Sequence, residues 1–265
     1  MTVLRVLAWG VATSVRDAGR PGLAHLGRSR GGAVDLDAHR LGNRLVGNAS
    51  DATAFETSGG LTLLAERAVV VCVTGSPAEL YVDGGPPLGW GIPVALPAGA
   101  SMRIGRLRGG ARTYLAVRGG VVSVDGDAVS IGPEPAVPPL GEAAVPPALD
   151  ASVRLWPGPR VDWFDDGSFD LLVRATSTIL PASDRVGLRL DGPALRRSVE
   201  RELPSEGLVE GAVQVPPDGR PIVMLADHPT TGGYPVIAVV DPADLSIVAQ
   251  RPPGSSLNFR RATPR

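Results

Sequence analysis

Residues 207–240 read GLVEGAVQVPPDGRPIVMLADHPTTGGYPVIAVV, and this stretch contains the pattern that decides the fold. Three short apolar runs, at 209–215, 221–225 and 236–240, are separated by segments rich in glycine and proline. Short runs with many Val and Ile residues are typical of β-strands, and Gly and Pro between them are typical of turns. The stretch therefore predicts three short strands joined by loops.

The same pattern continues towards both ends of the chain. Runs rich in Val, Leu and Thr predict further strands at 4–9, 11–15, 61–64, 69–74, 79–82, 102–104, 113–118, 153–156, 170–175 and 186–190. Asp83-Gly84-Gly85 predicts a turn, because glycine tolerates a positive φ. With 34 Gly and 26 Pro, the composition also favours many short strands over long helices. We expect a mostly β protein of the barrel or sandwich type.

One segment predicts a helix. Its apolar residues recur at the spacing of a single helix face, at Val34, Ala38, Leu41 and Leu45. Asp35 is placed to cap the start and Gly47 to end the helix. Residues 194–203 (ALRRSVEREL) fit either a short helix or an arginine-rich loop. The residues after Phe259 are basic, and we expect them to fray.

The length of 265 residues allows one large domain or two modest ones. Between residues 125 and 150 the chain consists mainly of Pro, Ala and Gly with scattered acids and no period, which is typical of a linker. We therefore predict a β-barrel domain at 1–124, a linker at 125–150 and a second β-barrel domain at 151–265.

Composition excludes several classes of function. Basic and acidic residues number 26 and 27, and no run of five like charges occurs, so neither nucleic acid nor a membrane is expected as a partner. The chain contains no lysine, which excludes a P-loop ATP site, a Schiff base and a biotinyl lysine within it. No membrane span or signal peptide is evident and the single Cys72 fits a core position, so we expect a cytoplasmic protein.

A first group of candidate binding or catalytic residues lies near the N-terminus. Asp17, Arg20 and His25 stand among closely spaced glycines, where Arg20 and His25 could bind a carboxylate or relay a proton. Alternatively, Asp17 and Arg20 only pair to hold a turn. Asp35 and His39 are four residues apart, a spacing that suits two metal ligands, but no third ligand is near and we predict no metal site.

Two more groups follow in the second half. Alternation along a strand would place Arg185, Gly187 and Arg189 on one face, which suits anion binding, or simply a solvated surface. The segment 227–235 carries Asp, His, two Thr and two Gly, more donors and acceptors than a plain turn needs, and we favour function over a hydrogen-bonded turn. No Gly-x-Ser-x-Gly elbow, paired-cysteine motif or dinucleotide fingerprint is present.

Four stretches, in this order, resemble one known family. They are VRDAGRPGLAHLGRSRGGAVDLDAHRLGNRLVGN (15–48), GARTYLAVRGGV (110–121), ASDRVGLRL (182–190) and the stretch from Gly207 to Gly254. The family is allophanate hydrolase subunit 2, also called KipA-like, to which the C subunit of 5-oxoprolinase belongs. The resemblance implies two cyclophilin-like β-barrel domains.

The resemblance also implies partners and an activity. Members of this family work in a hetero-oligomer with a KipI-like protein, the B subunit, and in many bacteria with a further protein, the A subunit. The complex is an ATP-dependent 5-oxoprolinase, which opens the lactam of 5-oxo-L-proline to L-glutamate. ATP is then used by the complex, and the resemblance assigns no cofactor to this chain itself.

The family motifs imply a set of site residues in this chain. The resemblance suggests His25, Asp227 and His228 as catalytic groups. The implied substrate-binding residues are Asp17, Arg20, Asp35, Arg185, Arg189, Gln214, Thr230, Thr231, Gly232, Gly233 and Tyr234. We expect Arg20, Arg189 and the Thr-Thr-Gly-Gly-Tyr turn to converge on a cleft for a small anion.

The chain departs from the family pattern at two places. After Val121 the family usually continues through a Gly-Ser-Arg-Ser-Thr motif and a long loop, which this chain lacks, and Pro229 stands where the family has Gln, with no lysine after Pro235. Two alternatives follow from the same resemblance. One is the carboxyltransferase role of this domain pair in urea carboxylase, and the other is a KipA-like antagonist that binds a kinase inhibitor without catalysis.

Overall fold

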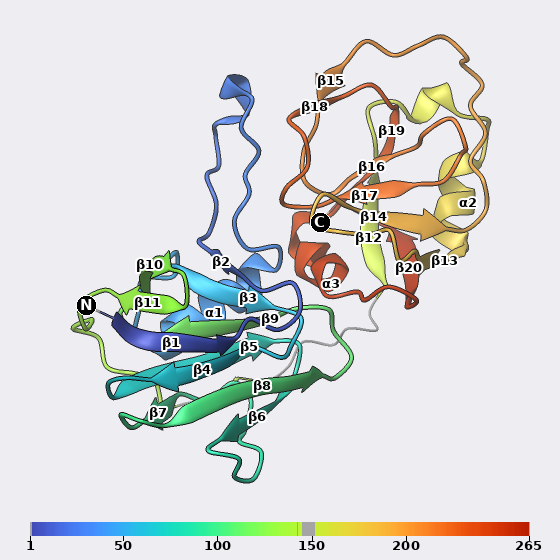
Figure 1. Ribbon diagram of the computed structural model, residues 1–265. Helices are drawn as coiled ribbons and strands as arrows, with labels where there is room; N and C mark the ends of the chain where they lie inside the picture. The colour runs from blue at the N-terminus through green and yellow to red at the C-terminus, as the bar shows by residue number, and fades with distance from the viewer. Residues whose placement is uncertain (1, 142, 145–151, 265) are drawn as a thin grey trace. The chain divides into compact units, whose positions relative to one another are not determined.

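The computed structural model describes residues 2–141, 143–144 and 152–264. The chain divides into two compact units, which are coloured by residue number in Figure 1. The first comprises Met1–Gly19 and Asp35–Pro147, and the second comprises Arg20–Val34 and Ala148–Arg265. Residues 20–34 thus belong to the same unit as the C-terminal half. Among the described residues, no helix has the length and apolarity to cross a membrane.

The first unit contains two antiparallel sheets. The six-stranded sheet has the order β10-β11-β1-β4-β8-β6, with β10 (Val121–Asp125), β11 (Ala128–Ile131), β1 (Thr2–Ala8), β4 (Thr62–Ala65), β8 (Ser101–Leu107) and β6 (Ala78–Val82). The five-stranded sheet has the order β2-β3-β9-β5-β7, with β2 (Ser14–Arg16), β3 (Ala54–Thr57), β9 (Thr113–Val117), β5 (Val69–Gly75) and β7 (Val94–Leu96). Buried residues of both sheets, such as Leu63 and Leu115, form one core.

Helix α1 (Leu36–Leu45) covers β5 and β9. As predicted, the Asp35 side chain caps it by accepting a hydrogen bond from the Ala38 N–H at 3.0 Å. The helix lies close to the sheet because Gly42 carries no side chain where Thr74 approaches. Cys72 is buried beneath it, as expected, and burial raises the pKa of its thiol to about 12.

The second unit contains the closed barrel that the sequence predicts. Its strands follow the order β12-β19-β16-β17-β14-β13-β20. Their bounds are β12 (Val153–Pro157), β19 (Val236–Val240), β16 (Ala212–Gln214), β17 (Ile222–Met224), β14 (Gly187–Asp191), β13 (Thr176–Ile179) and β20 (Ser256–Arg261). A small sheet pairs β15 (Glu206–Gly207) with β18 (Thr231–Gly232). The helical elements of this unit are η1 (Ala24–Leu26), η2 (Val161–Trp163), α2 (Ser168–Arg174), η3 (Pro242–Asp244) and α3 (Leu245–Ala249).

Several local predictions need correction. The strand predicted at 170–175 is wrong, because residues 170–174 lie in α2, where Phe169 and Leu172 are buried at helical spacing. The residues after Phe259 do not fray at once, since Arg260 and Arg261 pair with β12. Residues 194–203 form no helix. The stretch 125–150 contains strand β11, and its residues 142 and 145–150 lie outside the described ones. The first unit holds two sheets rather than one closed sheet.

We predict that Gly42→Ala lowers the free energy of unfolding, although alanine is the better helix former by about 1 kcal/mol. An added Cβ would lie 2.8 Å from Oγ1 of Thr74. That hydroxyl is held by a 2.6 Å hydrogen bond to the Ala38 carbonyl and cannot move away cheaply. Urea unfolding measures the change, and the exposed Arg40→Ala on the same helix is the control, expected to change stability by less than about 0.5 kcal/mol. A Gly42→Ala variant as stable as the parent would contradict the packing argument.

Candidate functional site

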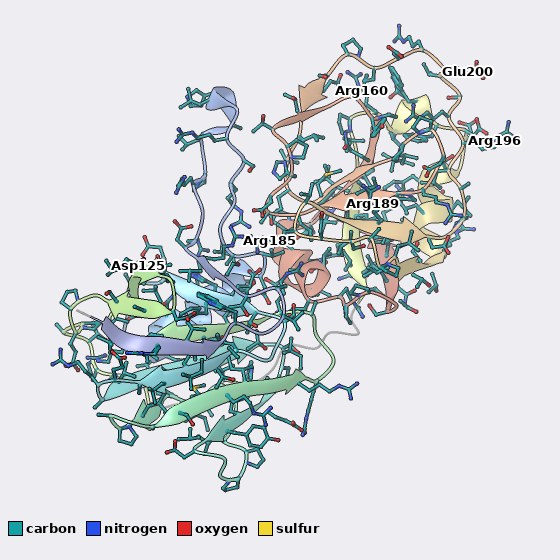
Figure 2. All side chains as sticks on the ribbon, viewed as in Figure 1. Asp125, Arg160, Arg185, Arg189, Arg196 and Glu200 are labelled. Carbon is teal, nitrogen blue, oxygen red and sulfur yellow. The ribbon has the colours of Figure 1, made fainter. Side chains whose placement is uncertain are left out.

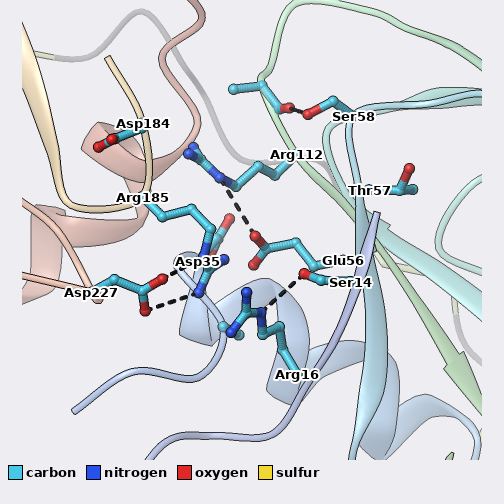
Figure 3. A network of polar contacts seen from close by, with 12 residues as sticks. Ser14, Arg16, Asp35, Glu56, Thr57, Ser58, Arg112, Asp184, Arg185 and Asp227 are labelled. Atoms are coloured by element: carbon cyan, nitrogen blue, oxygen red, sulfur yellow. Dashed lines mark hydrogen bonds and ion pairs between the residues drawn. The ribbon is translucent and has the colours of Figure 1, made fainter. Parts of the chain in front are cut away.

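Three of the predicted clusters meet within the second unit at one ion pair. Nε and Nη2 of Arg185 lie 2.8 and 3.3 Å from the two carboxylate oxygens of Asp227, as the dashed lines in Figure 3 show. Nη2 also donates a short hydrogen bond to the carbonyl of Gly32. One guanidinium therefore joins the segment before β14, the loop after β17 and the glycine pair near the N-terminus.

Strand pairing explains why Arg185 meets Asp227. β14 runs antiparallel to β17, with Gly187 opposite Met224. The pairing continues past the strand ends, because the Asp227 N–H donates to the Arg185 carbonyl at 3.1 Å. Residues just before β14 and just after β17 must then lie side by side.

Residues 30–34 are firmly attached to this unit. Arg30 forms a two-pronged ion pair with Glu210, at 2.8 and 2.9 Å, and both side chains are largely buried. The Gly31 N–H donates to the Ala226 carbonyl at 3.0 Å, and Val34 is buried in the core of the barrel. These contacts hold the Gly32 carbonyl within reach of Arg185.

Arg20 and His25 precede residues 30–34 in the sequence and lie in the exposed part of the same segment. Both side chains are exposed, and the Arg20 N–H donates to the Arg30 carbonyl at 2.7 Å. Nδ1 of His25 lies 3.0 Å from the Gly22 carbonyl. A carbonyl only accepts, so Nδ1 carries a proton in this contact.

The Thr-Thr-Gly-Gly-Tyr turn is a structured strand edge. Thr231 and Gly232 pair with β15, and the Thr230 carbonyl accepts a hydrogen bond from the Leu208 N–H at 2.9 Å. Nε2 of the buried Gln214 donates to the Tyr234 carbonyl at 3.0 Å. A Cβ on Gly232 would lie 2.7 Å from that same nitrogen, so only glycine allows this close approach.

His228 is buried next to Asp227 in the chain. Its Nδ1 lies 2.7 Å from the Pro229 carbonyl, so this nitrogen carries a proton. In the neutral form of the ring, Nε2 is then the nitrogen with the lone pair that a general base requires. Arg189, by contrast, is exposed on β14. The anion-binding face predicted for Arg185 and Arg189 therefore has one member that is already paired with Asp227.

Gly233 and Tyr234 line a cavity of about 930 Å³ in this unit. The rest of its wall comes from residues 194–203 and 217–219, and neither Arg20 nor Arg189 contributes to it. Among the described residues, no group of three or more His, Cys, Asp or Glu is arranged to hold a metal ion.

In the first unit, a buried polar network surrounds Asp35. Its N–H donates to the Tyr114 hydroxyl at 2.8 Å, and this hydroxyl donates to Oε2 of Glu56 at 2.7 Å. Nε of Arg112 lies 3.7 Å from Glu56, as Figure 3 shows. Burial raises the pKa of Tyr114 well above its usual value, so its hydroxyl keeps the proton. The predicted Asp17 carboxylate accepts the Gly19 N–H at 2.9 Å, a contact within the turn that does not involve Arg20.

Sequence reasoning missed Glu56, Tyr114 and Arg112. Glu56 and Tyr114 stand directly opposite each other on β3 and β9. The sequence feature that could have indicated Glu56 is a carboxylate within the fully buried strand AFET. The strand register that places Tyr114 opposite it cannot be read from the local sequence.

His39 lies in the same unit and is fully buried. Its Nε2 donates to the Arg16 carbonyl at 3.1 Å, and its ring meets Tyr114 edge-on with centroids 6.1 Å apart. Burial lowers the pKa of His39, although the Arg16 carbonyl and the nearby Glu56 and Asp17 carboxylates act in the opposite direction. Protonation of the ring therefore requires a lower pH in the folded chain than in the unfolded chain.

We predict that breaking the Arg185–Asp227 pair reveals a coupling energy of about 1 kcal/mol or more. The two side chains are only 20% and 29% exposed, so solvent screens them less than a surface pair. A double-mutant cycle with Arg185→Gln and Asp227→Asn measures this energy by urea unfolding. The matched control is Arg261 with Asp170, 52% and 49% exposed, for which about 0.5 kcal/mol or less is expected. Equal coupling in the two cycles would remove the argument.

We predict that His39 makes stability fall on acidification. Because its pKa is lowered in the folded state, the unfolded chain binds more protons below the usual pKa of about 6.5. The stabilising contribution is complete above pH 6.5 and is lost as the pH falls below it. His39→Gln should therefore unfold with a smaller dependence on pH between 7 and 5 than the parent. An unchanged slope in His39→Gln would refute this.

A two-residue turn stands where the resemblance predicts a long loop. Strands β10 and β11 pair with Asp125 opposite Ala128, so that only Gly126 and Asp127 connect them. The carbonyl of Asp127 accepts the Val6 N–H at 2.8 Å, and its carboxylate accepts the Trp9 indole N–H at 3.1 Å. The short turn is thereby fixed to β1.

The comparisons with known proteins agree with these observations. The family described as "Carboxyltransferase domain, subdomain A and B" matches residues 26–125 and 124–261, two ranges that meet at the end of β10. The chain is 35% identical to the C subunit of 5-oxoprolinase from Escherichia coli, over 97% of this chain and 90% of that protein. It is 34% identical to the corresponding 5-oxoprolinase protein of Haemophilus influenzae, over 93% of this chain and 87% of that protein.

Among solved structures, the urea carboxylase of Kluyveromyces lactis is similar, with a TM-score of 0.89 and 25% identity. The similarity covers 99% of this chain but only 27% of that one. The alignment with the Escherichia coli protein spans 282 positions, more than the 265 residues of this chain, so the relative contains residues without a counterpart here. Because the two matched ranges and the aligned relatives cover nearly the whole sequence, this chain belongs to the carboxyltransferase domain family.

Proposed function

We propose that this chain is the C subunit of a bacterial ATP-dependent 5-oxoprolinase, which opens the lactam of 5-oxo-L-proline to give L-glutamate. The observation that carries the proposal is the 35% identity to the corresponding Escherichia coli protein, which extends over nearly the whole of both chains. The alternative role, carboxyl transfer to urea, is less well supported, because the chain corresponds to only 27% of the urea carboxylase that it resembles.

The reaction needs partner proteins. The chain contains no lysine and therefore no P-loop ATP site. The other members of the proposed cytoplasmic complex are the KipI-like B subunit and the A subunit. Hydrolysis breaks the lactam C–N bond, adds the oxygen of water to the carbonyl carbon to form a carboxylate, and leaves both protons of that water on the released amine. An unactivated lactam resists attack by water, which is why the reaction is coupled to phosphoryl transfer from ATP.

Residues of this chain can contribute a base and an anion contact. Nε2 of His228 has the lone pair to accept a proton from water, and Asp227 beside it is held in place by Arg185. Arg20, Arg185 and Arg189 are the candidate contacts for the substrate carboxylate. His25, with its exposed ring, is the second candidate base.

We predict that the chain co-expressed with its two partner proteins releases glutamate from 5-oxo-L-proline only when ATP is supplied. Coupled detection of glutamate measures the rate, and the two partners without this chain are the reference. A fully assembled complex of all three proteins that turns over no 5-oxo-L-proline with ATP would contradict the proposal and favour a regulatory role.

We predict that His228→Gln lowers kcat of the complex by about 10²-fold or more, as loss of a general base does. The matched control is Arg261→Gln, which removes an exposed ion pair on the same barrel and should leave kcat unchanged. Circular dichroism and size-exclusion chromatography show whether each variant folds and assembles. A folded, assembled His228→Gln complex with the parent's kcat would rule out His228 as the base.

A further inference from the structure

The cavity beside Tyr234 has one wall made by a loop with no helix or strand of its own. Residues 194–203 are attached to the barrel by the buried Leu195, whose N–H donates to the Gly219 carbonyl at 3.0 Å, and by the Ser198 N–H, which donates to the Trp163 carbonyl at 3.0 Å. Figure 2 shows Arg196 and Glu200 of this loop pointing outward. The loop therefore has a fixed backbone and presents charged side chains around the cavity.

Arg197 is a charged residue of this loop that contacts the barrel. Its Nη2 donates a short hydrogen bond to the Val215 carbonyl, and its guanidinium carbon lies 5.9 Å from the centroid of the Tyr234 ring. Its Nε is buried and has no hydrogen-bond partner among the described residues. Burial lowers the pKa of Arg197, in keeping with a cation that has lost part of its hydration.

This guanidinium has no acidic partner in the part of the chain that the structure describes. The neighbouring Arg196 lies 3.8 Å from Asp165, and Arg160 pairs with Glu206, but no ion pair of the described residues includes Arg197. A partly buried cation without a counter-charge is costly, and an anion that occupied the cavity would remove that cost. The ring of Tyr234, 44% exposed, offers an apolar surface next to it.

The rest of the lining limits the charge of such a ligand. Glu200, Glu202 and Asp218 also line the cavity, together with Arg196 and Arg201. The acids and bases at the exposed rim nearly cancel, which disfavours a polyanion such as a nucleotide. We propose that this cavity binds a small molecule with a single carboxylate, which Arg197 anchors and against which the Tyr234 ring packs. The proposal concerns binding to this chain alone and holds with or without the lactam-opening activity.

Isothermal titration of the full chain with benzoate and with benzamide tests the proposal, because the two probes share a ring and differ in charge. The parent should bind benzoate at least about tenfold more tightly than benzamide. Arg197→Gln should abolish this preference, whereas Arg261→Gln, which removes an exposed arginine outside the cavity lining, should bind benzoate within about twofold of the parent.

Two outcomes would overturn the proposal. One is a parent that shows no preference for benzoate, a result that needs no variant. The other is a folded Arg197→Gln chain with the parent's affinity for benzoate. If Arg197→Gln does not fold, Arg197→Lys provides the same test, since it keeps the charge but loses the forked donors. It should bind benzoate more weakly than the parent and still prefer benzoate to benzamide, and loss of that preference would count against the proposal.

Discussion

The antiparallel pairing of β14 with β17 is the constraint on which the candidate site of the second unit depends. This register brings Arg185 and Asp227 together, although 42 residues separate them. The guanidinium of Arg185 also donates a hydrogen bond to the Gly32 carbonyl. This bond holds a segment from the N-terminal part of the sequence against the barrel formed by the C-terminal part. A slip of one residue in this pairing would turn the side chains of the shifted strand to the opposite face and separate Arg185 from Asp227.

Sequence patterns predicted the strands best where apolar residues form a short run between Gly or Pro. β5, β12 and β19 lie within a residue or two of their expected positions. The strand prediction failed at 170–175 because DLLVRA is apolar enough for either a strand or a helix. Only the burial of Phe169 and Leu172 in the folded chain distinguishes the two. β3 was not predicted, because a buried strand that contains Glu56 and Thr57 has no apolar signature.

The candidate site was predictable in its residue types but not in its geometry. Segments 183–190 and 227–235 stand out in the sequence because they are rich in Gly, Asp, His and Arg. The two segments meet through Arg185 and Asp227, and this contact follows from strand pairing. The exposed positions of Arg20, His25 and Arg189 do not follow from composition, since a charged side chain beside glycines can turn either way. Residues 194–203 were recognisable as arginine-rich, but only the tertiary contacts with Val215 and Tyr234 distinguish Arg197 from its neighbours.

The buried position of Cys72 has a practical consequence. It is the one cysteine in the sequence, and helix α1 shields its thiol on the sheet. Cysteines introduced at chosen surface positions can therefore carry spin labels or fluorophores without prior removal of the native residue. A pair of such labels, one on each unit, would report how the distance between the units changes when partner proteins or small molecules are added.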